Sequence, residues 1–98
     1  MVKSIVWTSE ADNDFKKIVF YLKKEWGIQS AEKFIVNLFL RLDKLVKMPT
    51  IAPSTSKAGT KMYKLDKKNV LFFTIDGENI VLLSIYPYKK DIFKSKYY

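Results

Sequence analysis

The sequence predicts an α+β domain in which a helical hairpin packs on one face of a small antiparallel sheet, in the order β-α-α-β-β-β. Three observations predict this fold. Two long stretches carry apolar residues at helical spacing and meet at Trp26 and Gly27. Strand-like apolar runs separated by short polar turns follow them. The chain has 98 residues, 48% of them hydrophobic, so we expect one domain, residues 1–98, with one core.

The first expected elements are a short strand, residues 4–8, and a helix that begins after it. Ser9 is the expected N-cap of this helix. Acidic residues occupy its first turns, where the helix dipole favours negative charge: Glu10, Asp12 and Asp14. One apolar face then runs along the helix: Ala11, Phe15, Ile18, Val19, Leu22 and Trp26. Gly27 suits the left-handed position that ends a helix.

The second helix is expected to start near Ser30 and to stop before Pro49. Its apolar stripe is broad: Ala31, Phe34, Ile35, Leu38, Phe39, Leu42, Leu45 and Val46. Because only a few residues separate the two helices, they must run antiparallel as a hairpin.

The rest of the chain is predicted to form a loop and an antiparallel meander. Residues 49–60 are rich in Pro, Ser and Thr, which is typical of a loop. Three strands are expected beyond it, at residues 61–65, 69–76 and 79–86, joined by two hairpin turns. A sheet this small must bury one face against the helices. The tail beyond Pro87 is basic and aromatic, and we expect it to be partly ordered.

The residue types that are missing exclude several kinds of chemistry. The sequence has no His and no Cys, which removes histidine general bases, thiol nucleophiles and the usual zinc ligands. Its three glycines lie far apart, so no phosphate-cradling loop is expected. We therefore expect no cofactor and no metal. No apolar run is long enough to cross a membrane, and the start of the chain lacks a signal-peptide pattern, so a cytoplasmic location is expected.

A formal net charge of +8 favours an anionic partner, such as nucleic acid, a ribosome or an acidic protein. The alternative is a solvated surface that promotes solubility. Seventeen of the eighteen cations are lysines and the other is Arg41. Lysine is poor at bidentate recognition of bases, so sequence-specific base reading is not expected.

Three apolar residues lie on the outer sides of the predicted helices. On a helical wheel, Phe20 falls among lysines, and Val36 and Leu40 fall opposite the apolar stripe. Single exposed apolar residues are ordinary. Three of them on one hairpin indicate a patch for contact with another protein.

Lysines and aromatic residues alternate over the second half of the chain. The lysines are Lys57, Lys61, Lys64, Lys67, Lys68, Lys89, Lys90, Lys94 and Lys96. The aromatic residues are Tyr63, Phe72, Phe73, Tyr86, Tyr88, Phe93, Tyr97 and Tyr98. On a sheet face, such groups can hold a phosphate backbone and stack a base, or act as acid and base in RNA cleavage. The alternative is that the lysines are solvated and that Phe72 or Phe73 belongs to the core.

Several local patterns together resemble the RelE/ParE superfamily of bacterial toxins, the toxin halves of type II toxin–antitoxin pairs. The resemblance covers nearly the whole chain. Its most specific pieces are Trp7 with Ala11 and Phe15, the break at residues 25–27, Ala31 with Phe34, Pro49, and the strand at residues 69–75. It implies the fold predicted above.

The superfamily contains two activities. RelE-like members cleave mRNA in the ribosome with lysines, arginines and a C-terminal tyrosine, whereas ParE-like members lack much of that set and are associated with poisoning DNA gyrase. Carried over here, Lys64 matches one nuclease lysine, but Asp66 and Val70 stand where a second lysine and an arginine are expected. Tyr88 or Lys89 stands where the nuclease pattern has another arginine. Phe93 stands near the position of the nuclease tyrosine, for which Tyr97 and Tyr98 are possible substitutes. Valine cannot stabilise a transition-state anion as arginine does.

The resemblance therefore favours a ParE-like toxin that binds a macromolecular target, DNA gyrase, and that a cognate antitoxin neutralises. Enzyme activity is left open but not favoured. Candidate antitoxin contacts are Phe20, Val36 and Leu40. The alternative is a ribosome-dependent mRNA endoribonuclease that uses Lys61, Lys64, Lys89, Lys90 and Tyr98. A homodimer and a heterotetramer with the antitoxin are both compatible with the resemblance.

Overall fold

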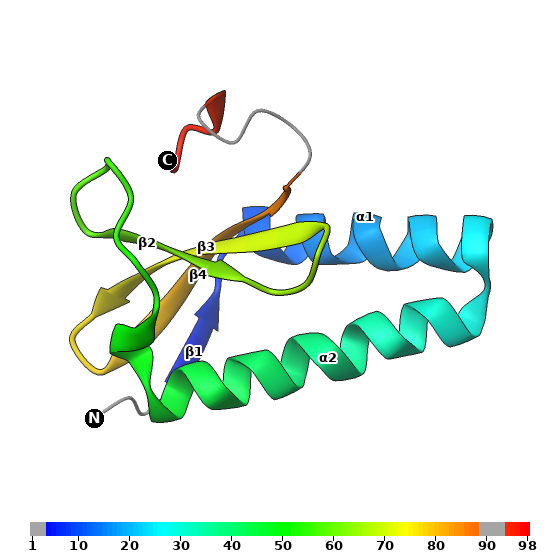
Figure 1. Cartoon of the computed structure of the whole chain (residues 1–98), viewed down its shortest axis with the longest axis horizontal. Helices are drawn as coiled ribbons and strands as arrows, with labels where there is room; N and C mark the ends of the chain where they lie inside the picture. Colours follow the sequence, from blue (N-terminus) through cyan, green and yellow to red (C-terminus); the bar gives the residue numbers. More distant parts are fainter. Residues whose placement is uncertain (1–3, 89–93) are drawn as a thin grey trace.

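The computed structural model describes residues 4–88 and 94–98. The elements follow the predicted order: β1 (Ser4–Trp7), α1 (Ser9–Trp26), α2 (Ile28–Lys47), the short 3₁₀ helix η1 (Pro49–Ile51), β2 (Thr60–Lys64), β3 (Asn69–Asp76) and β4 (Asn79–Pro87). The two helices run antiparallel and cover one face of a four-stranded sheet (Figure 1). The predicted α+β fold class is confirmed.

The strand order in the sheet is β1-β4-β3-β2. β2, β3 and β4 form the predicted antiparallel meander. β1 runs parallel to β4, with Ser4 opposite Asn79 and Trp7 opposite Leu82, so the sheet as a whole is mixed. Within the meander, β3 pairs with only one edge of β4, and β1 pairs with the other edge.

Two helix boundaries differ from the prediction. Thr8, not Ser9, is the N-cap of α1, because its side-chain oxygen accepts a hydrogen bond from the Ala11 amide at 3.2 Å. The Thr8 hydroxyl also donates to the Leu82 carbonyl at 2.7 Å, which fixes the start of α1 to β4. α2 begins at Ile28 rather than near Ser30, because Gly27 alone, at φ +96°, reverses the chain.

The core lies between the helices and the sheet. Fully buried side chains from both layers meet there: Ala11, Leu38, Leu45, Leu65, Leu71, Phe73, Ile80 and Leu82. Trp26 and Phe39, which were expected on the apolar faces, are instead exposed. For Trp26 the reason is plain in Figure 1, because the end of the hairpin extends past the sheet and has no layer to pack on.

The opposite face of the sheet carries Val70 and Phe72, which are fully buried although they do not belong to the helix-side core. The C-terminal residues 94–98 return to this face, where the Tyr97 ring lies 6.0 Å from the Phe72 ring. The tail is tied down at Tyr98, whose carbonyl accepts a hydrogen bond from the Lys57 amide at 3.0 Å. The described part of the tail is therefore ordered against the sheet.

Candidate macromolecular binding surface

The three predicted antitoxin contacts are exposed, as expected from their positions on the helices. Val36 and Leu40 line one shallow groove on the outer side of α2, together with Gln29, Glu32, Lys33 and Asn37. Phe20 is 68% exposed but lies on α1 and is not part of that groove. The structure thus brings Val36 and Leu40 together and leaves Phe20 apart from them.

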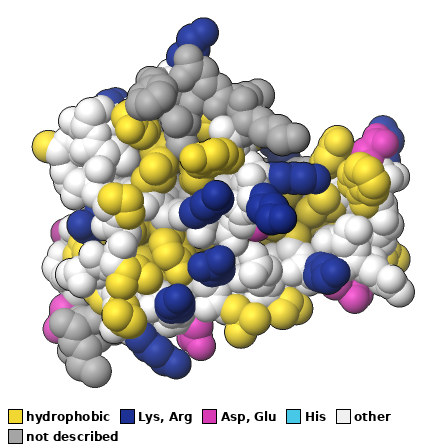
Figure 2. Space-filling model, in the orientation of Figure 1, with side chains coloured by type: hydrophobic (Ala, Val, Ile, Leu, Met, Phe, Trp, Pro, Cys, Tyr) yellow, Lys and Arg dark blue, Asp and Glu magenta, His cyan; other side chains and the backbone are white. Residues whose placement is uncertain are grey.

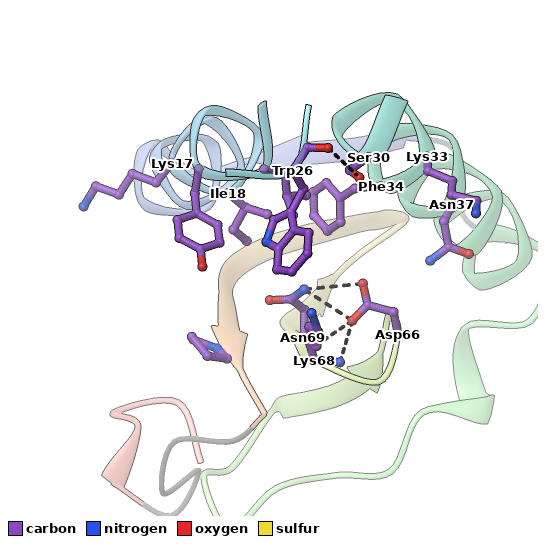
Figure 3. A pocket seen from close by; sticks show the side chains of 13 residues that line it. Lys17, Ile18, Trp26, Ser30, Lys33, Phe34, Asn37, Asp66, Lys68 and Asn69 are labelled. Carbon is purple, nitrogen blue, oxygen red and sulfur yellow. Dashed lines mark hydrogen bonds between the residues drawn. The ribbon is translucent and has the colours of Figure 1, made fainter. Parts of the chain in front are cut away.

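A larger groove of about 820 Å³, here called the hairpin groove, lies between the end of the helical hairpin and the turn that joins β2 to β3. The helices contribute Lys17, Ile18, Tyr21, Leu22, Trp26, Ser30, Lys33, Phe34 and Asn37, and the sheet contributes Asp66, Lys68, Asn69 and Pro87. Figure 3 shows the Trp26 indole pointing from the end of α1 toward Asn69 at the start of β3. The groove has an apolar floor and a rim of lysines.

Asp66 organises the turn between β2 and β3 through hydrogen bonds. Asp66 Oδ1 accepts hydrogen bonds from the Lys68 amide at 2.7 Å and from the Asn69 amide at 2.8 Å. The Asn37 side chain of α2 donates to the Leu65 carbonyl at 2.9 Å and so ties the turn to the helix. The Asp66 carboxylate is therefore engaged by the backbone of its own turn.

A second groove of about 660 Å³, here called the sheet-edge groove, lies on the other side of the same turn. Its lining includes Arg41, Tyr63, Lys64, Lys67, Val70 and Tyr88, and it shares Asn37 and Asp66 with the hairpin groove. Four positions that the resemblance relates to nuclease residues thus meet in one place: Lys64, Asp66, Val70 and Tyr88. Lys64 Nζ lies 4.9 Å from the centroid of the Tyr88 ring.

The structure does not bring the whole predicted nuclease set together. Lys61 and Lys64 are three residues apart in β2 and therefore point to opposite faces of the sheet. Lys89 and Lys90 lie outside the described residues, as does Phe93. Tyr98 lies beside the loop that contains Lys57 rather than in the sheet-edge groove.

A polar cluster fastens the tail to α1. The Tyr97 hydroxyl donates to Glu10 Oε1 at 2.7 Å, and Lys96 Nζ lies 2.8 Å from the same oxygen. Burial raises the pKa of Glu10, but hydrogen bonds from Lys96 and Tyr97 and the charge of Lys96 outweigh it, so the pKa is below its usual value. Burial, followed by the bond to Glu10, raises the pKa of Tyr97. Tyr97 is therefore held as a neutral donor beside an ionised carboxylate.

Sequence reasoning missed the roles of Trp26 and Arg41 in these grooves. Trp26 was assigned to the core face, and Arg41 was noted only as the single arginine. The position of Trp26 next to the break at Gly27 was the available signal, because a residue at the end of a hairpin can extend past the layer below. Nothing in the local sequence indicated that Arg41 faces the β2 edge.

Over residues 4–88 and 94–98, no helix is long and apolar enough to cross a membrane. Within these same ranges, no three or more Asp or Glu side chains gather into a metal site. The described residues that line the two grooves supply cations, amides, aromatic rings and the Asp66 carboxylate.

Comparison with known proteins places the chain in a family. Residues 5–92 match the family model described as the ParE toxin of the type II toxin–antitoxin system, parDE. The chain has no match among curated proteins. A chromosomal ParDE toxin–antitoxin system from P. aeruginosa contains a similar structure, with a TM-score of 0.75 and 19% identity over 88% of this chain and 96% of the other.

Two further structures share the fold. A YoeB/ParE toxin from Agrobacterium tumefaciens gives a TM-score of 0.67 and 9% identity over 87% of this chain and 98% of the other. A YoeB–YefM complex from Staphylococcus aureus gives a TM-score of 0.62 and 14% identity over 87% of this chain and 94% of the other. At these identities the structural likeness shows the fold alone, whereas the family model covers most of the sequence. This chain belongs to the ParE toxin family of type II toxin–antitoxin systems.

Proposed function

We propose that this toxin inhibits growth by binding DNA gyrase rather than by cleaving RNA, and that a cognate antitoxin neutralises it in the cytoplasm. The observation that carries the proposal is Val70. Its side chain is fully buried at the position where the resemblance expects a catalytic arginine. A buried aliphatic group offers no charge to a scissile phosphate, and loss of one such group typically costs about 10²–10³ in rate.

The surroundings of Val70 support the same proposal. Val70 pairs with Lys64 on β2 and with Tyr86 on β4. Lys64 is drawn to the Tyr88 ring, and Lys61 points to the other face of the sheet. The two β2 lysines of the nuclease set, Lys61 and Lys64, thus lie on different faces of the sheet.

One observation favours the second candidate function, ribosome-dependent mRNA cleavage. Arg41, Lys64 and Tyr88 line the same groove, so an arginine, a lysine and a tyrosine are neighbours there, although from different elements than in the nuclease pattern. This arrangement would be a new nuclease site rather than the one that the resemblance predicts.

Expression of the toxin alone, followed by two readouts, separates the candidates. We expect growth arrest with DNA breaks and filamentation, and inhibition of supercoiling when purified gyrase is mixed with the toxin. Cuts placed by codon in primer extension on translated mRNA, lost in the double variant R41A and K64A, would instead establish the nuclease. The Lys23→Ala variant is a matched control, because Lys23 lies outside both grooves.

For the antitoxin, support comes from the groove on α2. Val36 and Leu40 give it apolar side chains 58% and 64% exposed, which a folding antitoxin segment can bury. Leu40→Asp should reduce retention of the product of the adjacent small open reading frame in a pull-down. Ile28→Asp is the control, because Ile28 is an exposed apolar residue on α2 outside this groove. Unchanged retention with Leu40→Asp would remove this groove from the interface.

A further inference from the structure

We infer that the hairpin groove and the sheet-edge groove together bind a single-stranded nucleic acid without reading its sequence. This inference goes beyond the proposed function, because it assigns a ligand class to a surface whatever the cellular target is. The two grooves lie on either side of the β2–β3 turn and share two lining residues, Asn37 and Asp66.

The first support is charge. Three lysines line the hairpin groove, Lys17, Lys33 and Lys68, and three cations line the sheet-edge groove, Arg41, Lys64 and Lys67. Among the described residues, Asp66 is the one acidic residue that lines either groove, and the amides of its own turn already bind its carboxylate. Figure 2 shows Lys and Arg side chains gathered over the part of this face that lies between the sheet and α2. Such a track matches the regular negative charge of a phosphate backbone.

The second support is a pair of exposed rings, each beside a lysine, on the two sides of the turn. Trp26 is 65% exposed and has Lys68 Nζ 5.9 Å from its ring centroid. Tyr88 is 45% exposed and has Lys64 Nζ 4.9 Å from its ring centroid. A ring held open beside a cation can stack an unpaired base while the cation meets the neighbouring phosphate.

These features favour a single strand over a duplex and over an acidic peptide. Bases must be unstacked from a duplex before they can lie on side-chain rings. An acidic peptide without aromatic or arginine side chains would satisfy the lysines but would give the two rings no side chain to stack on. Five of the six cations are lysines, which hold phosphates as point charges and do not read base edges.

Fluorescence anisotropy of the whole chain with a short labelled oligothymidylate tests the inference. We expect Trp26→Ala and Tyr88→Ala each to weaken binding by about 5- to 150-fold, the range for loss of one stacked base. Phe20→Ala is the matched control, because Phe20 is an exposed helix ring outside both grooves, and it should bind like the unchanged protein. A urea melt of each variant confirms that it is folded.

The salt dependence provides a second readout. Each of Lys64→Gln, Lys67→Gln and Lys68→Gln should lower the slope of log K against log salt by about 0.7, the value for one phosphate contact on a single strand. Lys23→Gln and Lys24→Gln, which lie outside both grooves, should leave the slope unchanged. Oligouridylate in a parallel titration identifies RNA or DNA as the source by its relative affinity.

Three results would overturn the inference. Ring variants that bind like the unchanged protein would show that nothing stacks there. Equal losses in the groove variants and the Lys23 and Lys24 controls would show diffuse charge. A duplex, or polyglutamate at equal charge, that binds as tightly as the single strand would show that the surface reads charge alone.

Discussion

Asp14 and Ile85 are joined by a hydrogen bond from the Ile85 amide to Asp14 Oδ2, at 3.1 Å. The same oxygen accepts a hydrogen bond from the Ser84 hydroxyl at 3.0 Å. The pairing of β1 with β4 ends at Trp7 and Leu82, so within residues 4–88 and 94–98 no strand lies beside this edge of β4 beyond Leu82. The Asp14 carboxylate on α1 therefore accepts the hydrogen bond of a β4 amide that lies beyond the end of β1. It joins the helix to the sheet at the bulge in β4.

Asp14→Ala should lower the free energy of unfolding by about 1–3 kcal/mol, because the partly buried Ile85 amide and Ser84 hydroxyl lose their acceptor. Urea denaturation measures the loss. Asp12→Ala is the control, because Asp12 forms an exposed ion pair with Lys16 one turn away, which contributes about 0.3–0.5 kcal/mol. Equal effects of the two substitutions would contradict the role of Asp14.

The Glu10 cluster predicts that the tail loosens in acid. The pKa of folded Glu10 lies below its ordinary value of 4.5, so folding favours the ionised form. The stabilisation is therefore complete above the pKa of the unfolded chain, and it is lost as the pH falls through the folded pKa. At alkaline pH the sign is reversed, because folding raises the pKa of Tyr97 above its ordinary value of 10.0. The stability that Tyr97 contributes is therefore complete below pH 10.0 and is lost as the pH rises through the folded pKa.

The measurement is the urea midpoint between neutral pH and about pH 3, compared between the unchanged protein and Glu10→Gln. Gln keeps an acceptor for Tyr97 but does not titrate, so the variant should lose less stability on acidification. Because the Glu10 side chain is 39% exposed, solvent screens the pair with Lys96 and the difference should be small. Parallel pH profiles would show that the tail contact does not depend on the charge of Glu10.

The order of elements could be predicted from the sequence because it depends on local periodicity. The apolar spacing of both helices, Gly27 between them and the turn residues at Asp76 and Gly77 each act within a few positions of the chain. The parallel pairing of β1 with β4 could not be predicted, because four residues pair with a strand about 75 positions away. The acidic residues near the start of α1 were interpreted as dipole partners, and only the fold shows that Asp14 binds β4 and Glu10 binds the tail.

The candidate surface was predictable in composition but not in shape. Lysines interleaved with aromatic residues indicated an anionic ligand, and Lys64, Lys67 and Lys68 do line the grooves. The helical wheel placed Trp26 in the core because it contains no information on where the sheet ends. Arg41 reaches the sheet-edge groove from a helix, a juxtaposition that depends on how α2 crosses β2.

Tyr63→Phe should leave the free energy of unfolding unchanged or raise it by up to about 1 kcal/mol. The substitution removes a buried hydroxyl that has no partner among the described residues and leaves the ring in the core. Urea denaturation of the ligand-free protein measures the change. Tyr97→Phe is the control, because it removes a hydroxyl that does have a partner, Glu10, and should be destabilising. A loss with Tyr63→Phe as large as with Tyr97→Phe would mean that the Tyr63 hydroxyl is hydrogen-bonded in solution.

The turn between the helices predicts a different response at two glycines. Gly27 has φ +96° and ψ 169°, a combination that is essentially restricted to glycine, whereas Gly77 has φ +60°, which asparagine tolerates. A Cβ added at either position would meet no heavy atom within 4 Å, so the backbone alone decides the cost. Gly27→Asn should therefore lower the free energy of unfolding by about 1–3 kcal/mol, and Gly77→Asn by clearly less. Both are read from urea denaturation. Equal losses would mean that the chain can reverse at residue 27 through an ordinary backbone conformation, and the single-residue break between α1 and α2 would then not depend on glycine.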